Sequence, residues 1–149
     1  MKAARPDLTI AINGGIACIE EGLPHLDRVD GVMLGRAAYQ RPYLLAEVDR
    51  AFFAATNAPP PRADVAAVMA NYADRHVAAG GRLGNIARHM INLYHGRPRG
   101  RLFRRYLSEN AYEPGADGDV IRAATKLVEG SGAEGAGRLS SRQPHSALT

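Results

Sequence analysis

Two short glycine-containing stretches near the start of the chain carry the residue types that bind phosphate. The apolar run 8–12 leads into Asn13-Gly14-Gly15, and the apolar run 31–34 leads into Gly35-Arg36. Both runs are typical of short buried parallel strands, and each ends in glycine before an expected helix. Each pair alone is compatible with an ordinary βα turn. Together, one βα unit apart, their N–H groups and the arginine predict a phosphate-binding cup.

Five arginines within nine positions form the second candidate site. They are Arg97, Arg99, Arg101, Arg104 and Arg105. In a helix over 100–110, an apolar stripe falls opposite three of these arginines and is formed by Leu102, Phe103, Tyr106 and Leu107. Arg101 and Arg104 are three residues apart and point the same way. The cluster is either a solvated face or a contact surface for nucleic-acid phosphates, and arginine without lysine favours phosphate.

The remaining reactive residues offer no catalytic arrangement. Cys18 begins an expected helix, which would lower its thiol pKa, but without a neighbouring base it is expected to be a small buried apolar residue. His89 and His95 are six residues apart, share no helix face, and are expected to serve packing or capping rather than metal binding. The sequence shows no Ser-His-Asp set, paired catalytic carboxylates or zinc-ligand spacing, so we expect no metal.

The elements that position these residues fall on either side of a proline-rich segment. Before it, the pattern predicts a helix over 19–26, shortened or kinked by Pro24, one turn over 36–39, and a helix from Pro42 to about Ala54. The three consecutive prolines 59–61 can continue neither a helix nor a strand, so residues 58–63 are predicted to be a stiff linker.

Beyond the linker the pattern is helical. Helices are expected over 64–79, 85–95, 100–110 and 118–128. Asp64 and Asp117 are expected to cap the first and last of them, and Gly80-Gly81 and Gly96 to end the first two. Loops this short predict an antiparallel bundle over 64–130. Residues 131–149 are rich in Gly, Ser and Ala without periodicity and are predicted to be a disordered tail.

Length and composition set the outer limits. The chain has 149 residues, which is too few for a complete (β/α)8 barrel of roughly 250 residues. No apolar run approaches the ~20 residues of a membrane span, and the first residues lack the apolar core of a signal peptide, so a cytoplasmic setting is expected. The net charge of +4 belongs to residues 58–130, which hold eleven Lys/Arg and seven Asp/Glu.

Four motifs in order resemble the tRNA-dihydrouridine synthases, specifically subfamily A. They are residues 8–16, 29–42, 84–90 and 104–110, within a resemblance over residues 6 to about 129. The resemblance implies a (β/α)8 barrel that binds FMN and a C-terminal helical domain that grips tRNA. It implies that NADPH reduces the flavin, which delivers hydride to the C5=C6 bond of a D-loop uridine. The positions that match FMN contacts are Asn13, Gly14, Gly15, Gly35 and Arg36, and those that match tRNA contacts are Arg101 and Arg104.

The expected fold is therefore α/β plus all-α: the last two βα units of the barrel over 1–57, then the linker, then the helical tRNA-binding domain over 64–130. The family's first six βα units and its catalytic cysteine would precede Met1, and Cys18 does not match that cysteine. We thus expect the C-terminal portion of a monomeric enzyme, inactive by itself. Two alternatives remain, namely a stand-alone tRNA-binding helical module and a fragment of another phosphate-binding barrel.

Overall fold

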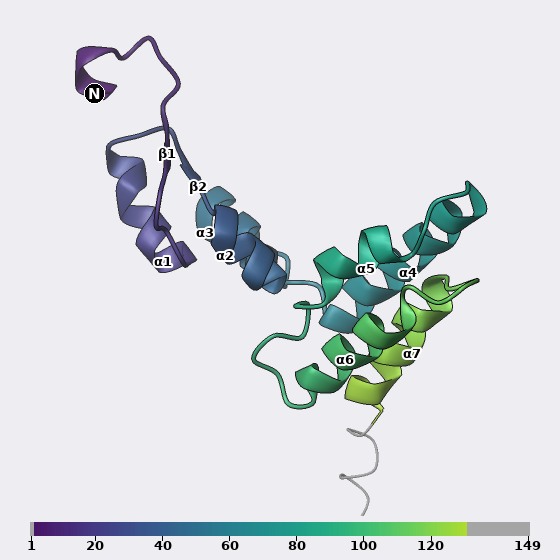
Figure 1. The fold of residues 1–149 in the computed structure, drawn as a ribbon. Coiled ribbons are helices and arrows are strands. Elements are labelled where there is room, and N and C mark those ends of the chain that lie inside the picture. The colour runs from purple at the N-terminus through teal and green to yellow at the C-terminus, as the bar shows by residue number, and fades with distance from the viewer. Residues whose placement is uncertain (1, 131–149) are drawn as a thin grey trace, which may run out of the picture.

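The chain forms two groups of elements that lie end to end (Figure 1). The computed structural model describes residues 2–130. The N-terminal part, residues 2–53, holds two strands and several short helices, and the helical part, residues 62–130, holds four longer ones. The expected tail over 131–149 lies outside the described residues.

The two strands are parallel neighbours, as expected, but each has only three residues. Strand β1 (Ala11–Asn13) pairs with β2 (Gly31–Met33), with Ala11 opposite Gly31 and Asn13 opposite Met33. The expected strand over 8–12 starts later because side chains take the bonds before Ala11. The Asp30 carboxylate accepts from the Ile10 N–H at 2.8 Å, and Lys2 Nζ donates to the Leu8 carbonyl at 2.6 Å.

Short helices follow each strand, and prolines decide their type. After β1, α1 (Ile19–Gly22) continues as the 3-10 helix η2 (Leu23–Asp27), because Pro24 lacks the N–H that an α-helix needs. After β2 come α2 (Gly35–Gln40), the 3-10 helix η3 (Pro42–Glu47) and α3 (Val48–Phe53). The predicted helix from Pro42 is thus 3-10 in its first half. A further 3-10 turn, η1 (Lys2–Ala4), precedes β1.

The helical part consists of α4 (Arg62–Ala78), α5 (Gly84–Met90), α6 (Gly100–Asn110) and α7 (Gly118–Glu129). Helix α6 has the predicted bounds, and Asp117 caps α7 by accepting the Asp119 N–H at 2.9 Å. The prediction for Asp64 was wrong, because α4 begins directly after Pro61 and places Asp64 within its first turn. The prediction that the second helix reaches residue 95 was also wrong, because turns follow Met90.

A core of buried apolar side chains joins α4, α5, α6 and α7. Its largest fully buried side chains are Phe103, Leu83, Leu107 and Ile121. Three alanines of α4, at positions 66, 70 and 73, are almost completely buried and let α7 approach closely. Leu102 departs from the predicted stripe, because 39% of it is exposed.

The N-terminal part has a thinner core. Among its described residues the buried apolar side chains are those of Ile16, Ile19 and Ala37. Large apolar side chains such as Met33, Leu45 and Phe53 are exposed. Among residues 2–130, none of the helices has both the length and the apolar character needed to cross a membrane.

Candidate functional site

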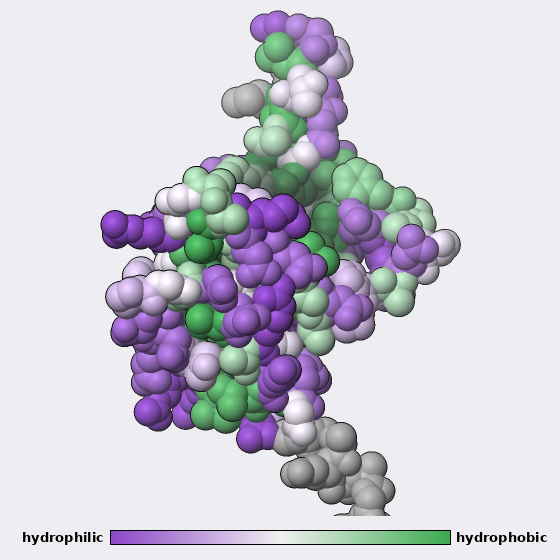
Figure 2. Space-filling view, turned by 90° about the vertical axis from the view of Figure 1, so that its right-hand side faces the viewer, coloured by the Kyte–Doolittle hydropathy of each residue, from purple (hydrophilic) through white to green (hydrophobic). Residues whose placement is uncertain are grey.

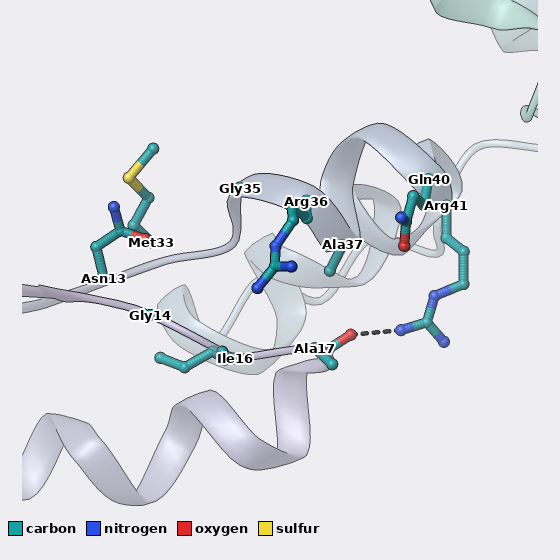
Figure 3. A pocket seen from close by; sticks show the side chains of 11 residues that line it. Asn13, Gly14, Ile16, Ala17, Met33, Gly35, Arg36, Ala37, Gln40 and Arg41 are labelled. Atoms are coloured by element: carbon teal, nitrogen blue, oxygen red, sulfur yellow. Dashed lines mark hydrogen bonds between the residues drawn. The ribbon is translucent and has the colours of Figure 1, made fainter.

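The carboxyl ends of β1 and β2 meet at a hollow of about 390 Å³ (Figure 3). All five residues of the predicted cup line it, namely Asn13, Gly14, Gly15, Gly35 and Arg36. They come together because the strands are parallel and in register, so that Asn13 lies opposite Met33 and the following glycines lie at one edge. The structure thus brings the first set of predicted site residues to one place.

Two glycines shape the floor of the hollow through their backbone conformation. Gly14 has φ +142° and Gly15 has φ +74°, values that side-chain-bearing residues rarely adopt. A Cβ built on either would meet no atom within 4 Å, so open space lies beside this backbone. A ligand can therefore approach the main chain at both positions.

The charged side chains that line the hollow are both cationic. The Arg36 guanidinium points into the space between the two strand ends (Figure 3). Arg41 donates from Nη2 to the Ala17 carbonyl, while the Ala17 N–H donates to Glu21 Oε2 at 2.7 Å. The backbone N–H and the carbonyl of Ala17 are thus both hydrogen-bonded, which fixes the loop that follows the glycines. Because no carboxylate from residues 2–130 lines the hollow, the site favours an anion.

These features fit a phosphate ester. The open glycine backbone is a cradle that a Cβ would partly fill, and Arg36 supplies a fixed positive charge with several N–H donors. Asn13 lines the same hollow and adds an amide side chain. The residues present therefore suit the phosphate end of the FMN that the sequence resemblance implies.

Cys18 lies just beyond this loop, and the expectation that it is buried was wrong. Its side chain is partly exposed because it precedes α1 at the surface. The backbone N–H of Glu21 lowers the pKa of the Cys18 thiol, but a hydrogen bond with Glu20, desolvation and the two glutamate charges outweigh it. The net pKa is raised, which disfavours the thiolate and a nucleophilic role.

The predicted arginine face lies on α6, in the other part of the molecule. Arg101, Arg104 and Arg105 are exposed there, opposite the buried Phe103. Arg105 is ion-paired with Glu109 at 2.8 Å. Arg104 Nη2 donates to Asn92 Oδ1 at 2.7 Å, which holds its guanidinium over the turn after α5. Arg101 makes no hydrogen bond or ion pair among the residues that the structure describes, so its N–H groups remain available.

One face of the helical part is largely hydrophilic. Figure 2 faces the helical part and shows hydrophilic side chains over much of it, with smaller apolar patches between them. The arginine face and the cup are separate sites, because one belongs to the helical part and the other to the N-terminal part (Figure 1). The structure therefore offers two anion-favouring surfaces rather than one.

The expectation that the histidines serve packing or capping fits His89 alone, because the His95 side chain is exposed. The His89 ring meets Tyr39 of α2 edge-on, with centroids 5.7 Å apart, and its Nε2 accepts from Arg88 Nε at 3.2 Å. Within residues 2–130 no three His, Cys, Asp or Glu side chains are grouped as a metal site would require.

Sequence reasoning missed three residues that connect the sites. Arg41 holds the loop of the cup, and Tyr43 and Arg62 stack on each other between the two parts of the chain. None of the three belongs to a periodic pattern. Their partners lie 24 residues away for Arg41 and 19 for Tyr43, so no local signal reveals them.

Comparison with known proteins identifies the family. The dihydrouridine synthase family model matches residues 1–129. The chain belongs to the dihydrouridine synthase family. The predicted family resemblance is thereby confirmed, and two adjacent parallel strands in a mostly helical chain are compatible with part of its barrel fold.

Among curated relatives, the chain is similar to proteins named tRNA-dihydrouridine(20/20a) synthase. The one from Shewanella oneidensis is 46% identical over 129 residues, which cover 87% of this chain and 38% of the relative. Those from Salmonella typhi and Escherichia coli K12 are each 47% identical over 128 residues, covering 86% of this chain and 39% and 37% of the relatives. The chain thus spans about two fifths of the length of the curated relatives it matches.

Proposed function

We propose that this chain takes part in forming dihydrouridine in tRNA, as the portion of a dihydrouridine synthase that holds the FMN phosphate and contacts tRNA. The observation that carries the proposal is the pairing of a glycine-arginine cup with an arginine-bearing helix in one chain of this family. The relatives' names refer to tRNA, and the two anion-favouring surfaces support contact with a cofactor phosphate and an RNA backbone.

In this proposal the cup binds the phosphate of FMN. The N–H groups beside Gly14 and Gly15 and those at Gly35 donate to phosphate oxygens, and the Arg36 guanidinium neutralises the charge. Asn13 adds an amide at the same edge. FMN bound there and reduced by NADPH would supply hydride to one carbon of the uridine C5=C6 bond, and the family's catalytic cysteine, as general acid, would supply the proton to the other carbon. Arg41 keeps the loop in place through the Ala17 carbonyl and needs no direct contact with the cofactor.

On the helical part, Arg101 and Arg104 contact the tRNA backbone and orient the D-arm. Arg101 is free to make a bidentate contact with a phosphate. Arg104 is held by Asn92, so less side-chain freedom is lost when it binds. This assigns residues 1–57 to the last two βα units of the barrel, 58–63 to the linker and 64–130 to the helical tRNA-binding domain of a cytoplasmic, monomeric enzyme.

The decisive experiment measures tRNA affinity of residues 1–149 as a function of salt. Each phosphate neutralised contributes about 0.9 to the slope of log affinity against log salt for a duplex, and about 0.7 for single strands. The double variant Arg101→Ala, Arg104→Ala is expected to lower the slope by about 1.5.

Arg105→Ala is the matched control, because it removes the same charge from the same helix. Glu109 already neutralises Arg105, so a smaller change is expected. If the double variant keeps the affinity and slope of the unchanged chain, the proposed tRNA contact is refuted. If Arg105→Ala has the same effect per charge, binding follows net charge and the assignment to Arg101 and Arg104 fails.

We further propose that residues 1–149, produced alone, do not reduce uridine. Cys18 is the single cysteine, and its raised pKa and place at α1 do not suit the family's general acid. The polypeptide is expected to purify without stoichiometric flavin and to leave the dihydrouridine content of tRNA unchanged. A yellow preparation with one FMN per chain would contradict this.

The second candidate is a stand-alone tRNA-binding module. It is favoured by the helical part's own core, whose fourteen buried residues all lie between positions 66 and 124. If residues 62–130 fold alone and bind tRNA as tightly as residues 1–149, the strands are not needed for binding.

A further inference from the structure

The two parts of the molecule touch over a small area. Within residues 2–130, the extensive helix-to-helix contacts are made inside each part, and the N-terminal part does not pack broadly against α4–α7. Small interfaces between parts of a chain ordinarily permit relative motion. Whatever fixes their orientation must therefore reside in the few side chains that contact both parts.

Tyr43 and Arg62 are the side chains at this junction. Tyr43 comes from η3 in the N-terminal part, yet its ring packs against the core of the helical part. The Arg62 guanidinium carbon lies 3.5 Å from the centroid of that ring, which is close stacking of a cation on an aromatic face. Tyr43 Oη also donates to the Pro60 carbonyl at 2.8 Å. One tyrosine thus meets both the linker and the first residue of α4.

Arg62 is in turn fixed to the helical part. Its Nε donates to the carbonyl of the buried Leu93 at 3.0 Å. Desolvation lowers the pKa of the Arg62 guanidinium, as expected for a cation drawn out of water, but an arginine remains charged at neutral pH. The guanidinium therefore contributes one N–H to the turn after α5 and its flat face to Tyr43.

We propose that the Tyr43–Arg62 stack is a clamp that sets the position of the arginine face relative to the cup. A chain of contacts connects the arginine face on α6 with the cup. Arg104 is bonded to Asn92, the neighbour of Leu93, and Leu93 accepts from Arg62. On the other side, Tyr43 follows closely after Arg41, which holds the Ala17 carbonyl at the edge of the cup.

The functional meaning of the clamp rests on the proposed function. If FMN sits at the cup and tRNA on α6, the uridine reaches the flavin only at one spacing of the two parts. Tyr43 and Arg62 are then positioning residues, because they touch neither ligand. The edge-on contact of Tyr39 with His89 is a second, weaker link on the same segment.

The test measures the spacing itself, so it does not depend on activity. In a Cys18→Ser background, spin labels are placed at the exposed positions 28 and 108 through Arg28→Cys and Ser108→Cys, one in each part. Pulsed electron paramagnetic resonance then gives the distribution of label-to-label distances. We expect a narrow distribution for the otherwise unchanged chain, and about a twofold wider one for Tyr43→Ala and for Arg62→Ala.

Two controls separate the clamp from general loosening. Arg75→Ala removes an arginine that lies 6.0 Å from the Tyr72 ring within α4, and it is expected to leave the distribution unchanged. Tyr43→Phe keeps the ring and loses the hydroxyl, and it is expected to keep the narrow distribution. Far-UV circular dichroism confirms that each variant is folded, and Tyr43→Ala decides the matter if Arg62→Ala does not fold.

Each possible result either supports or overturns the clamp. An unchanged width in Tyr43→Ala overturns the clamp, and so does equal broadening in Arg75→Ala. Broadening in Tyr43→Phe equal to that in Tyr43→Ala would assign the link to the hydroxyl and Pro60 and overturn the role of the stack. tRNA affinity is measured in parallel and is expected to stay within about twofold in Tyr43→Ala, because the arginine face lies within one part. If the unchanged chain does not bind tRNA, the proposed function is refuted, whereas the label-to-label distances still test the clamp.

Discussion

Replacing Phe103 by alanine tests which side of α6 faces the core. Phe103 is fully buried beside Leu107 and packs on Tyr94, with ring centroids 4.7 Å apart and planes tilted by 51°. Truncating a buried phenylalanine costs about 3–5 kcal/mol, of which the aromatic pair contributes about 0.5–1.5 kcal/mol. That is a large share of the total stability expected for a small helical unit.

The assay is urea unfolding followed by circular dichroism at 222 nm. With a urea dependence of about 1.5 kcal/mol/M, Phe103→Ala is expected to lower the midpoint by about 2–3 M or to leave the helical part unfolded without urea. Phe103→Leu supplies a graded step, because it keeps most of the volume and costs less than about 1.5 kcal/mol.

Leu102→Ala is the matched comparison on the adjacent residue. Because 39% of Leu102 is exposed, its truncation is expected to cost about 1–2 kcal/mol, well below the cost at Phe103. Equal midpoint shifts for Leu102→Ala and Phe103→Ala would refute the orientation of α6, and with it the position of the arginine face on the opposite side.

Three further outcomes are expected. Gly15→Ala places a side-chain-bearing residue at φ +74°, and we expect it to lower the free energy of unfolding by about 1–2 kcal/mol in thermal unfolding. Gly35→Ala is the control, because φ is not positive there, and it should change stability little. Equal effects of the two substitutions would refute the backbone argument. The Arg122 hydrogen bond, above all, holds the pKa of Asp74 below its usual 3.8, so this pair stabilises the fold above about pH 4 and that stabilisation is lost on further acidification. Asp74→Asn should therefore flatten the fall in melting temperature below pH 4, and an equally steep fall would contradict the linkage. Asp117→Ala should cost about 1 kcal/mol in urea unfolding while Asp117→Asn costs less, and no difference between them would argue against the side-chain cap.

The sequence was most informative where a pattern is local and repeated. The two apolar runs ending in glycine predicted neighbouring parallel strands, and these bring the cup residues together. The same holds for α6, whose bounds follow from Gly100 and an amphipathic run, and for Asp117, whose side chain caps α7. Each of these features depends on residues a few positions apart.

The predictions that were wrong concern residues whose structure is decided by groups far away in the sequence or by neighbouring side chains. Lys2 and Asp30 take bonds that would otherwise extend β1, and no pattern within residues 8–12 indicates this. Helix α4 begins at Arg62 because a proline restricts the residue before it and not the one after it. Leu102 fits the amphipathic period, but the core receives Phe103 and Leu107 from α6, so Leu102 remains at its margin.

The segment from Arg36 to Tyr43 carries a constraint on length as well as on residue type. Four functional residues fall within eight consecutive positions. Arg36 lines the cup and Tyr39 contacts His89. Arg41 supports the loop at Ala17, and Tyr43 stacks on Arg62. One residue inserted into α2 would turn everything after it by about 100° and advance it by about 1.5 Å. Such an insertion would remove no side chain, yet it would separate Tyr43 from Arg62. Over evolutionary time this stretch should therefore accept substitutions of residues far more readily than insertions or deletions.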